Sequence, residues 1–300
     1  AKHVLYNLFQ ALINKNDEVL IPAPYWVSYP EQVKIAGGVP IILKTNQENN
    51  FKINKKMLEN SLTEKTKILV LNYPSNPTGS TYNRNELNEI ASFVEKNNLI
   101  VISDEIYDKI LYDGHKHICF PELNENIKDR TILVNGVSKT YSMTGWRIGY
   151  AAGNSDVLSA MSNLSGQSTS NPTSISQKAA IEAFSGSQDE VPKMVKEFQS
   201  RRNYICDELN KTYGIKCMVP NGAFYVFPDI SSFFGKKFKD KIISNSTDFT
   251  NFLLDEAKVA VVPGVEFGSD NNIRISYATS MVDIKEGIQR IQDIINHYWG

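Results

Sequence analysis

One lysine of the chain, Lys139, lies in a loop of small and polar residues that runs from Asn135 to Gly149. Arg147 follows it eight positions later in the same loop. A lysine amine can hold an aldehyde as a Schiff base, and an arginine can bind a phosphate group through several hydrogen bonds. These two residue types at this spacing could therefore serve a phosphorylated aldehyde.

Two further polar motifs stand upstream of this loop. Asn76–Gly79 reads Asn-Pro-Thr-Gly and follows the apolar run 67–72, and Asp104–Tyr107 reads Asp-Glu-Ile-Tyr and ends the apolar run 99–104. Ligands of open α/β sheets gather at the carboxyl ends of the strands. We therefore expect the two motifs and the segment 136–139 to converge on one edge of a sheet.

The chemistry of pyridoxal phosphate requires four kinds of group around the cofactor. A lysine holds the aldehyde, a carboxylate keeps the pyridine nitrogen protonated, cations or backbone N–H groups bind the phosphate, and an aromatic face contacts the ring. Lys139, Asp104, Arg147 and either Trp26 or Tyr25 supply these types. The sequence therefore predicts a pyridoxal phosphate site.

Each of these motifs alone has an ordinary structural explanation. A lysine beside a strand is commonly solvated, and an aspartate at a strand end is commonly a helix cap. Asn-Pro-Thr-Gly is a turn signal in any fold, and an aromatic pair such as Tyr25-Trp26 is more often part of a core. It is their joint occurrence, in this order and after plausible strands, that favours the cofactor site.

The elements expected to position these residues alternate along the first part of the chain. Apolar residues recur at helical spacing over residues 4–13, and Asn83 with Glu86 is expected to cap a helix whose buried face is Leu87, Ile90, Ala91 and Val94. Strands are expected at residues 18–22, 67–72, 99–104, 130–135 and 147–152. This alternation predicts an α/β fold with a mostly parallel sheet covered by helices.

The pattern changes after a Gly/Ser/Pro-containing stretch at residues 185–192. A long amphipathic helix from Lys193 to about Tyr213 precedes expected strands at 223–227, 259–263 and 273–277 and a final helix at 284–295. We expect two domains: a large cofactor-binding domain at 1–192 and a smaller α+β domain at 193–300. The charged loop 235–241 is expected to be a solvated face.

Composition excludes some classes of function. The chain has 300 residues, 22% of them charged, and a formal net charge of −1, which argues against a nucleic-acid-binding surface. No apolar run has the roughly 20 residues that a membrane span requires. Three widely spaced cysteines are typical of reduced thiols, so a cytoplasmic protein is expected. His115 and His117 have metal-like spacing but no third ligand, and we interpret them as surface residues; no metal site is predicted.

The chain resembles the class I/II aminotransferases, pyridoxal phosphate enzymes of fold type I, and is most similar to their bacterial aspartate aminotransferase subgroup, which includes aspartate/prephenate enzymes. The resemblance covers essentially the whole chain. It is carried by five segments: Pro24–Pro30, Ser75–Gly79, Ser103–Tyr107, Met143–Gly149 and Arg274–Ser280.

The resemblance implies roles for the cofactor-binding residues. Lys139 would form the Schiff base and then act as general base and acid in the proton shift. Asp104 would pair with the pyridinium, and Asn76 and Tyr107 would hydrogen-bond the ring oxygen. Trp26 would stack on the ring. Arg147 would bind the phosphate.

It also implies substrate contacts. Arg274 would clamp the α-carboxylate through a two-pronged hydrogen bond. Trp26 and Asn76 would line the substrate site. Lys2 would face the distal carboxylate of aspartate or of a prephenate-like acid, although a solvated lysine at a helix start is an equal alternative. The implied pair is aspartate with 2-oxoglutarate.

The chain departs from the family pattern at two places. Gly136 stands where many members have a phosphate-binding serine, so Ser138 or backbone amides near Ala1 and Lys2 would contact the phosphate instead. Family members also have roughly a hundred residues before the position of Ala1. These carry a substrate contact, an arm that embraces the partner subunit and a tyrosine donated across the expected homodimer to the partner's phosphate.

Other functions remain open at this level. Related pockets carry out β-elimination, decarboxylation or cyclisation, or transaminate prephenate or aromatic amino acids, and the lysine motif does not separate these reactions. A pyridoxal-phosphate-binding regulatory domain is an alternative of another class. It would require a DNA-binding helix-turn-helix upstream.

Overall fold

The computed structural model describes residues 1–300 and contains a six-stranded central sheet. The strand order is β2-β1-β3-β4-β5-β6, with every neighbouring pair parallel except β5 and β6. The strands are β1 (Glu18–Ala23), β2 (Val39–Lys44), β3 (Thr66–Asn72), β4 (Ile100–Asp104), β5 (Thr131–Gly136) and β6 (Gly149–Ala152). The mostly parallel sheet expected from the sequence is confirmed.

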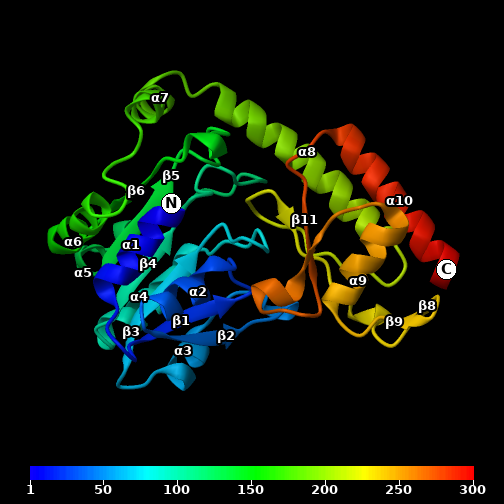
Figure 1. The fold of residues 1–300 in the computed structure, drawn as a ribbon, viewed down its shortest axis with the longest axis horizontal. Coiled ribbons are helices and arrows are strands. Elements are labelled where there is room, and N and C mark those ends of the chain that lie inside the picture. The colour runs from blue at the N-terminus through cyan, green and yellow to red at the C-terminus, as the bar shows by residue number, and fades with distance from the viewer.

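Helices cover both faces of this sheet (Figure 1). They are α1 (Lys2–Leu12), α2 (Ser28–Ile35), α3 (Lys55–Ser61), α4 (Arg84–Lys96), α5 (Glu125–Arg130) and α6 (Ser155–Gly166). A further helix, α7 (Ser174–Ser185), packs through Ala180 on Val137 and Ile148. One face packs on α3, α4 and α5, and the other packs on α1, α2 and α6. The predicted cap of α4 is present, because Asn83 and Glu86 bond each other's backbone N–H groups and all four expected residues of its apolar face are buried.

The C-terminal part is built on a smaller antiparallel sheet of order β10-β11-β7. Its elements are α8 (Glu190–Lys211), β7 (Tyr225–Val226), the hairpin β8 (Lys237–Phe238) and β9 (Lys241–Ile242), α9 (Ser246–Phe252), β10 (Val262–Pro263), β11 (Ile273–Ser276) and α10 (Met281–Trp299). Short 3-10 turns lie at Gln47–Asn49, Phe120–Glu122, Thr144–Trp146, Ser231–Phe233 and Gly264–Phe267, and a π-helical turn spans Leu253–Ala257.

The C-terminal elements differ from the sequence expectation mainly in length. Regular strand occupies only residues 225–226 of the expected 223–227 and only 262–263 of the expected 259–263. Lys258 ends the π-helical turn in a left-handed conformation, and the chain reaches β10 only four residues later. The charged loop 235–241 includes the start of a hairpin, whose Phe238 is buried while Lys237 and Lys239 are exposed.

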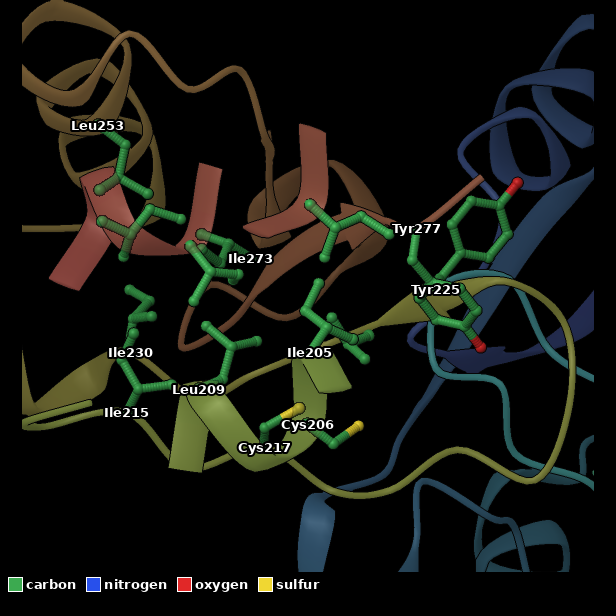
Figure 2. Packing of buried hydrophobic residues seen from close by; sticks show 14 of the residues in the cluster. Ile205, Cys206, Leu209, Ile215, Cys217, Tyr225, Ile230, Leu253, Ile273 and Tyr277 are labelled. Carbon is green, nitrogen blue, oxygen red and sulfur yellow. The ribbon is translucent and has the colours of Figure 1, made fainter. Parts of the chain in front are cut away.

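A hydrophobic core fills the C-terminal part (Figure 2). Ile205 and Leu209 of α8 pack there with Ile230 and Ile273, and α8 runs from beside α7 to α10 (Figure 1). The same cluster takes in residues that follow β4, Tyr107 among them. The core therefore joins the C-terminal part to the edge of the large sheet.

No helix combines the length and apolar character needed to cross a membrane. No cluster of three or more histidine, cysteine, aspartate or glutamate side chains is arranged to hold a metal ion.

Candidate active site

A cavity of about 310 Å³ lies between the carboxyl edge of the large sheet and the C-terminal part. Nine residues named from the sequence line it: Lys2, Trp26, Asn76, Asp104, Tyr107, Ser138, Lys139, Arg147 and Arg274. Tyr25, the alternative to Trp26, does not line it. Tyr29, Asn72 and Tyr225 also line it and were not named from the sequence. The convergence expected from strand topology is therefore present.

Asp104 is the last residue of β4 and is buried at the base of the cavity. Its Oδ2 accepts a hydrogen bond of 2.6 Å from the Tyr29 hydroxyl, and its Oδ1 accepts one of 3.3 Å from the backbone N–H of Ile106. Burial raises the pKa of the carboxyl, and these two bonds oppose the rise. A buried carboxylate held by neutral donors would be further stabilised by a cationic partner in the cavity.

Lys139 stands three residues beyond the end of β5 and is half-buried. Desolvation lowers the pKa of its amine, and the positive charges of Arg274 and Arg147 lower it further. No hydrogen bond engages its Nζ, which lies 5.4 Å from the ring centroid of Phe224. The lysine therefore has an increased share of the neutral, nucleophilic amine.

Arg274 comes from β11 and reaches the cavity from the C-terminal side. Its Nη1 donates a 3.0 Å hydrogen bond to Oδ1 of Asn76, and its guanidinium lies 4.6 Å from the ring centroid of Tyr225 and 4.9 Å from that of Phe267. The Nε is buried and has no partner. Because a buried donor without a partner is costly, this arginine is suited to an incoming anion.

Two hydroxyl groups meet beside Arg274. Tyr107 follows β4 and Tyr225 lies in β7, and their hydroxyl oxygens are 2.9 Å apart. Both side chains are buried. Burial is the largest cause that raises the pKa of each phenol, so both are neutral at ordinary pH.

Lys2, the first residue of α1, and Trp26, in the turn before α2, also line the cavity. The Trp26 ring packs edge-on against Tyr29, with centroids 5.2 Å apart, and the Lys2 Nζ lies 5.0 Å from the Trp26 ring centroid. A cation over an indole face is attracted to its electron density. Lys2, whose side chain is exposed, therefore adds a positive charge to the cavity wall, beside those of Arg147 and Arg274.

Arg147 and Ser138 stand near the mouth of the cavity. Arg147 ends the 3-10 turn Thr144–Trp146 with a φ of 58°, is exposed, and donates a 2.7 Å hydrogen bond to the carbonyl of Thr144. Ser138 is half-buried. A β-carbon on Gly136 would lie 2.8 Å from the carbonyl oxygen of Ile148 and 3.0 Å from Cα of Gly149, so this backbone has no room for a serine there.

The interpretation of His117 as a surface residue is wrong. Its side chain is half-buried, and Nε2 bonds the buried carboxylate of Glu105, which also accepts a 2.7 Å bond from the Ser103 hydroxyl. His115 is exposed, as expected. A buried acid that follows Asp104 requires donors, and the loop that contains His117 supplies them.

Sequence reasoning missed Tyr29 and Tyr225 because an aromatic residue within an apolar segment looks like core. A signal was present for Tyr29, which lies three positions after Trp26 in the segment Pro24–Pro30 that carries the family resemblance. For Tyr225, strand alternation could predict the face of the sheet on which the side chain lies, but not that its hydroxyl would contact the hydroxyl of Tyr107.

These residues fit pyridoxal phosphate. The buried carboxylate, the amine of lowered pKa, the arginine near the mouth and the indole are the four groups that the cofactor needs, and they line one cavity. Two further cations, Arg274 and Lys2, line the same cavity and remain to bind a carboxylate.

Comparisons with known proteins agree with this geometry. Residues 1–291 match the family model described as "Aminotransferase class I and II". The chain is 52% identical to an aspartate aminotransferase of Bacillus sp. (strain YM-2), over 98% of this chain and 74% of that protein. It is 50% identical to a probable aspartate/prephenate aminotransferase of Rickettsia typhi, again over 98% and 74% of the two chains.

The fold agrees as well. The crystal structure of an aspartate aminotransferase from Rhizobium meliloti superposes with a TM-score of 0.95 at 39% identity, over 98% of this chain and 74% of that one. An aromatic aminotransferase from Pyrococcus horikoshii superposes with a TM-score of 0.91 at 36% identity, over 99% and 78% of the two chains.

Proposed function

Because the chain belongs to the class I and II aminotransferase family, and is therefore a pyridoxal-phosphate-dependent enzyme, we propose that aspartate is its amino donor and 2-oxoglutarate its acceptor. The observation that carries this proposal is that two cations, Arg274 and Lys2, line the cavity in addition to Lys139 and Arg147, which serve the cofactor. Arg274 has a buried N–H without a partner, and the exposed side chain of Lys2 lies over Trp26. A dicarboxylate is the substrate class whose charges match two such cations.

The cofactor, when bound, supplies an electron sink that stabilises negative charge at the substrate Cα. Lys139 would hold the cofactor through its Nζ, and the same Nζ would be placed to take a proton from the substrate Cα. The lowered pKa of this amine suits it to act as the base. Over the two half-reactions the amino group of aspartate would be transferred to 2-oxoglutarate, and the donor would be released as its keto acid.

Other residues of the cavity hold the reacting groups in place. Asp104 would keep the proton on the pyridine nitrogen, and the Tyr29 hydrogen bond fixes the orientation of its carboxylate. Tyr107 and Asn76 would donate to the ring oxygen, and Trp26 would pack on the ring. Fixing these groups before reaction lowers the cost of reorganisation in the transition state.

At the phosphate end the proposal assigns Arg147, with Ser138 beside it. Arg147 is exposed at the mouth, and its side chain already points a nitrogen to the carbonyl of Thr144. The backbone around Gly136 is too tight for a side chain, so the hydroxyl contact falls to Ser138.

The proposal includes a homodimer of a cytoplasmic enzyme. Large apolar side chains are exposed near the mouth and on α7: Trp146 (45%), Ile175 (71%), Ile181 (56%) and Phe184 (47%). An exposed apolar surface of this kind favours burial against another subunit. The cysteines are free, which is typical of a reducing compartment. Light scattering should give twice the 33.8 kDa chain mass, and a stable monomer would contradict the dimer.

The test of the proposed function is a substrate comparison on the purified protein. Pyridoxal phosphate is added, the visible absorbance is recorded, and aspartate or tyrosine is then mixed in to follow the first half-reaction. The second-order rate constant of the first half-reaction should be at least about tenfold larger with aspartate than with tyrosine. The reason is that the second carboxylate of aspartate gains a charge-assisted hydrogen bond. The same comparison with 2-oxoglutarate and prephenate as acceptors tests the aspartate/prephenate alternative suggested by the Rickettsia relative.

A matched variant sharpens this comparison. Lys2→Met should reduce the rate with aspartate about tenfold while leaving the rate with tyrosine nearly unchanged. If both substrates lost rate equally, or if tyrosine exceeded aspartate in the unmodified protein, aspartate specificity would be rejected.

A further inference from the structure

Tyr225 contacts both halves of the cavity. Its hydroxyl is 2.9 Å from the hydroxyl of Tyr107, and its ring centroid is 4.6 Å from the guanidinium carbon of Arg274. The side chain is 6% exposed, so both contacts are shielded from water. One residue of a two-residue strand thus lies between a group at the edge of the large sheet and the arginine of the C-terminal part.

The hydroxyl contact limits what Tyr107 can do. A phenol has one proton to donate. If Tyr107 donates that proton to the cofactor ring oxygen, the proton in its bond with Tyr225 has to come from Tyr225. Accepting a hydrogen bond in turn polarises the Tyr107 hydroxyl and strengthens it as a donor. The charged side chains around Tyr107 are Asp104, Arg274 and Lys139, but the one hydrogen bond that its hydroxyl makes is the bond with Tyr225.

The ring contact limits what Arg274 can do. Its guanidinium packs between the rings of Tyr225 and Phe267, whose centroids lie 4.6 Å and 4.9 Å from the guanidinium carbon. Stacking on both aromatic faces leaves only the edge of the group for hydrogen bonds. One edge nitrogen already donates to Asn76, and the buried Nε has no partner. The rings therefore select the plane in which a carboxylate can be bound.

We propose that Tyr225 is a positioning residue with two separable effects: its hydroxyl orients and strengthens Tyr107 as a donor to the cofactor ring oxygen, and its ring holds Arg274 in the plane of the substrate carboxylate. This inference rests on the proposed function, since it assumes both the cofactor and the carboxylate. One side chain would then influence both the hydrogen bond to the cofactor ring oxygen and the binding of the substrate carboxylate.

The first test removes only the hydroxyl. Tyr225→Phe keeps the ring over Arg274 and deletes the bond to Tyr107. A weaker donor stabilises negative charge on the ring oxygen less, which favours the protonated state of the nitrogen that joins the cofactor to Lys139. The pH midpoint of the visible absorbance should rise by about half a unit, while the Kd of maleate, an unreactive dicarboxylate, should stay within about twofold.

The second test removes one stacked ring at a time. Tyr225→Leu should weaken maleate binding roughly tenfold and also raise the midpoint. Phe267→Leu is the matched control, because it removes the other face of the stack without touching Tyr107. It should weaken maleate binding by a similar factor and leave the midpoint unchanged. Circular dichroism verifies that each variant is folded. If Tyr225→Leu does not fold, Tyr225→Phe still tests the hydroxyl and Phe267→Leu still tests the stacking on Arg274.

The outcomes are distinguishable. If the unmodified protein gives no visible band with pyridoxal phosphate, the proposed function itself fails. If it gives the band but Tyr225→Phe titrates at the same pH, the hydroxyl effect is rejected. If the band is present but both leucine variants bind maleate as tightly as the unmodified protein, the role of the ring is rejected.

Discussion

The edge of the large sheet and the C-terminal part meet at one cavity but are built differently. At the edge, parallel strands pair in continuous register, so that Asn72 stands opposite Asp104 and the loops after β3, β4 and β5 leave from one line. In the C-terminal part, β7 and β10 have two residues each, and β11 has four. The first region is fixed by the backbone ladder, whereas the second depends on side-chain packing in its own core.

The contents of the two regions differ accordingly. The edge carries Lys139, Asp104 and Tyr107, which need accurate placement around a cofactor. The C-terminal part carries Arg274 and Tyr225, which recognise a carboxylate and adjust a neighbour. The residues that take part in bond making and breaking thus lie at the edge of the large sheet, which the backbone ladder fixes. The residues that recognise the substrate lie in the C-terminal part, which has fewer backbone hydrogen bonds between strands.

Replacing Lys139 should produce the largest effect. Lys139→Ala removes both the attachment point of the cofactor and the base, so kcat should fall by at least about 10⁴-fold. Absorbance spectroscopy should show loss of the visible band, and stopped-flow mixing with aspartate should show no rapid phase. Lys96→Ala, at an exposed position in the last turn of α4, is the control that should behave like the unmodified protein. An unchanged band in Lys139→Ala would show that another lysine holds the cofactor.

Changing the carboxylate at the same edge should rank second. Asp104→Asn keeps the shape but removes the charge that holds the pyridine proton, so kcat should fall about 10²–10⁴-fold. Tyr29→Phe leaves that charge and deletes one 2.6 Å bond to it, so its loss should be nearer tenfold. Steady-state kinetics measures both. Equal losses in the two variants would mean that orientation, not charge, is the contribution of Asp104.

On the C-terminal side, the expected effect is smaller and falls on binding. Arg274→Lys retains the charge but loses the planar fork, so KM for aspartate should rise about 10–100-fold with a smaller change in kcat. Arg84→Lys, on the exposed start of α4, serves as the control. A loss of kcat with unchanged KM would contradict the assignment of substrate recognition, rather than bond chemistry, to the C-terminal part.

The smallest expected effect is on the stability of the cofactor-free protein, in which the charge of Lys139 has no partner from the cofactor. Its folded-state pKa is lowered, so the unfolded chain binds the proton more tightly and the charge costs stability below that pKa. The cost disappears as the pH rises through the window from the lowered pKa to the ordinary value of 10.5. Cofactor-free Lys139→Met should therefore melt higher than the unmodified protein at pH 7.5, on the order of 2 °C, and the gap should close by pH 10.5. A gap that is constant with pH would exclude this cause.

Much of the sheet edge could be predicted from the sequence. Short apolar runs that end in Asn72 and Asp104 are typical of buried parallel strands, and parallel strands have a common carboxyl edge. That rule alone places the segments after β3, β4 and β5 together. The role of Lys139 needed the additional chemistry of its neighbours.

The remainder depended on contacts between distant segments. The bond between Tyr107 and Tyr225 joins residues 118 positions apart, and that between Tyr29 and Asp104 joins residues 75 apart. Periodicity does not encode which hydroxyl meets which oxygen across such separations. His117 was misread for the same reason, since its partner Glu105 was itself taken only as part of a motif.

The hydrogen bond from Arg274 to Asn76 spans 198 positions of sequence. Closing a loop of that length carries an entropic cost before any contact forms, and domains emerge from the ribosome N-terminal segment first. Every other cavity residue named here except Tyr225 has been synthesised once Arg147 has emerged. A nascent chain can thus order the cofactor half of its pocket well before translation delivers the arginine that completes the substrate half.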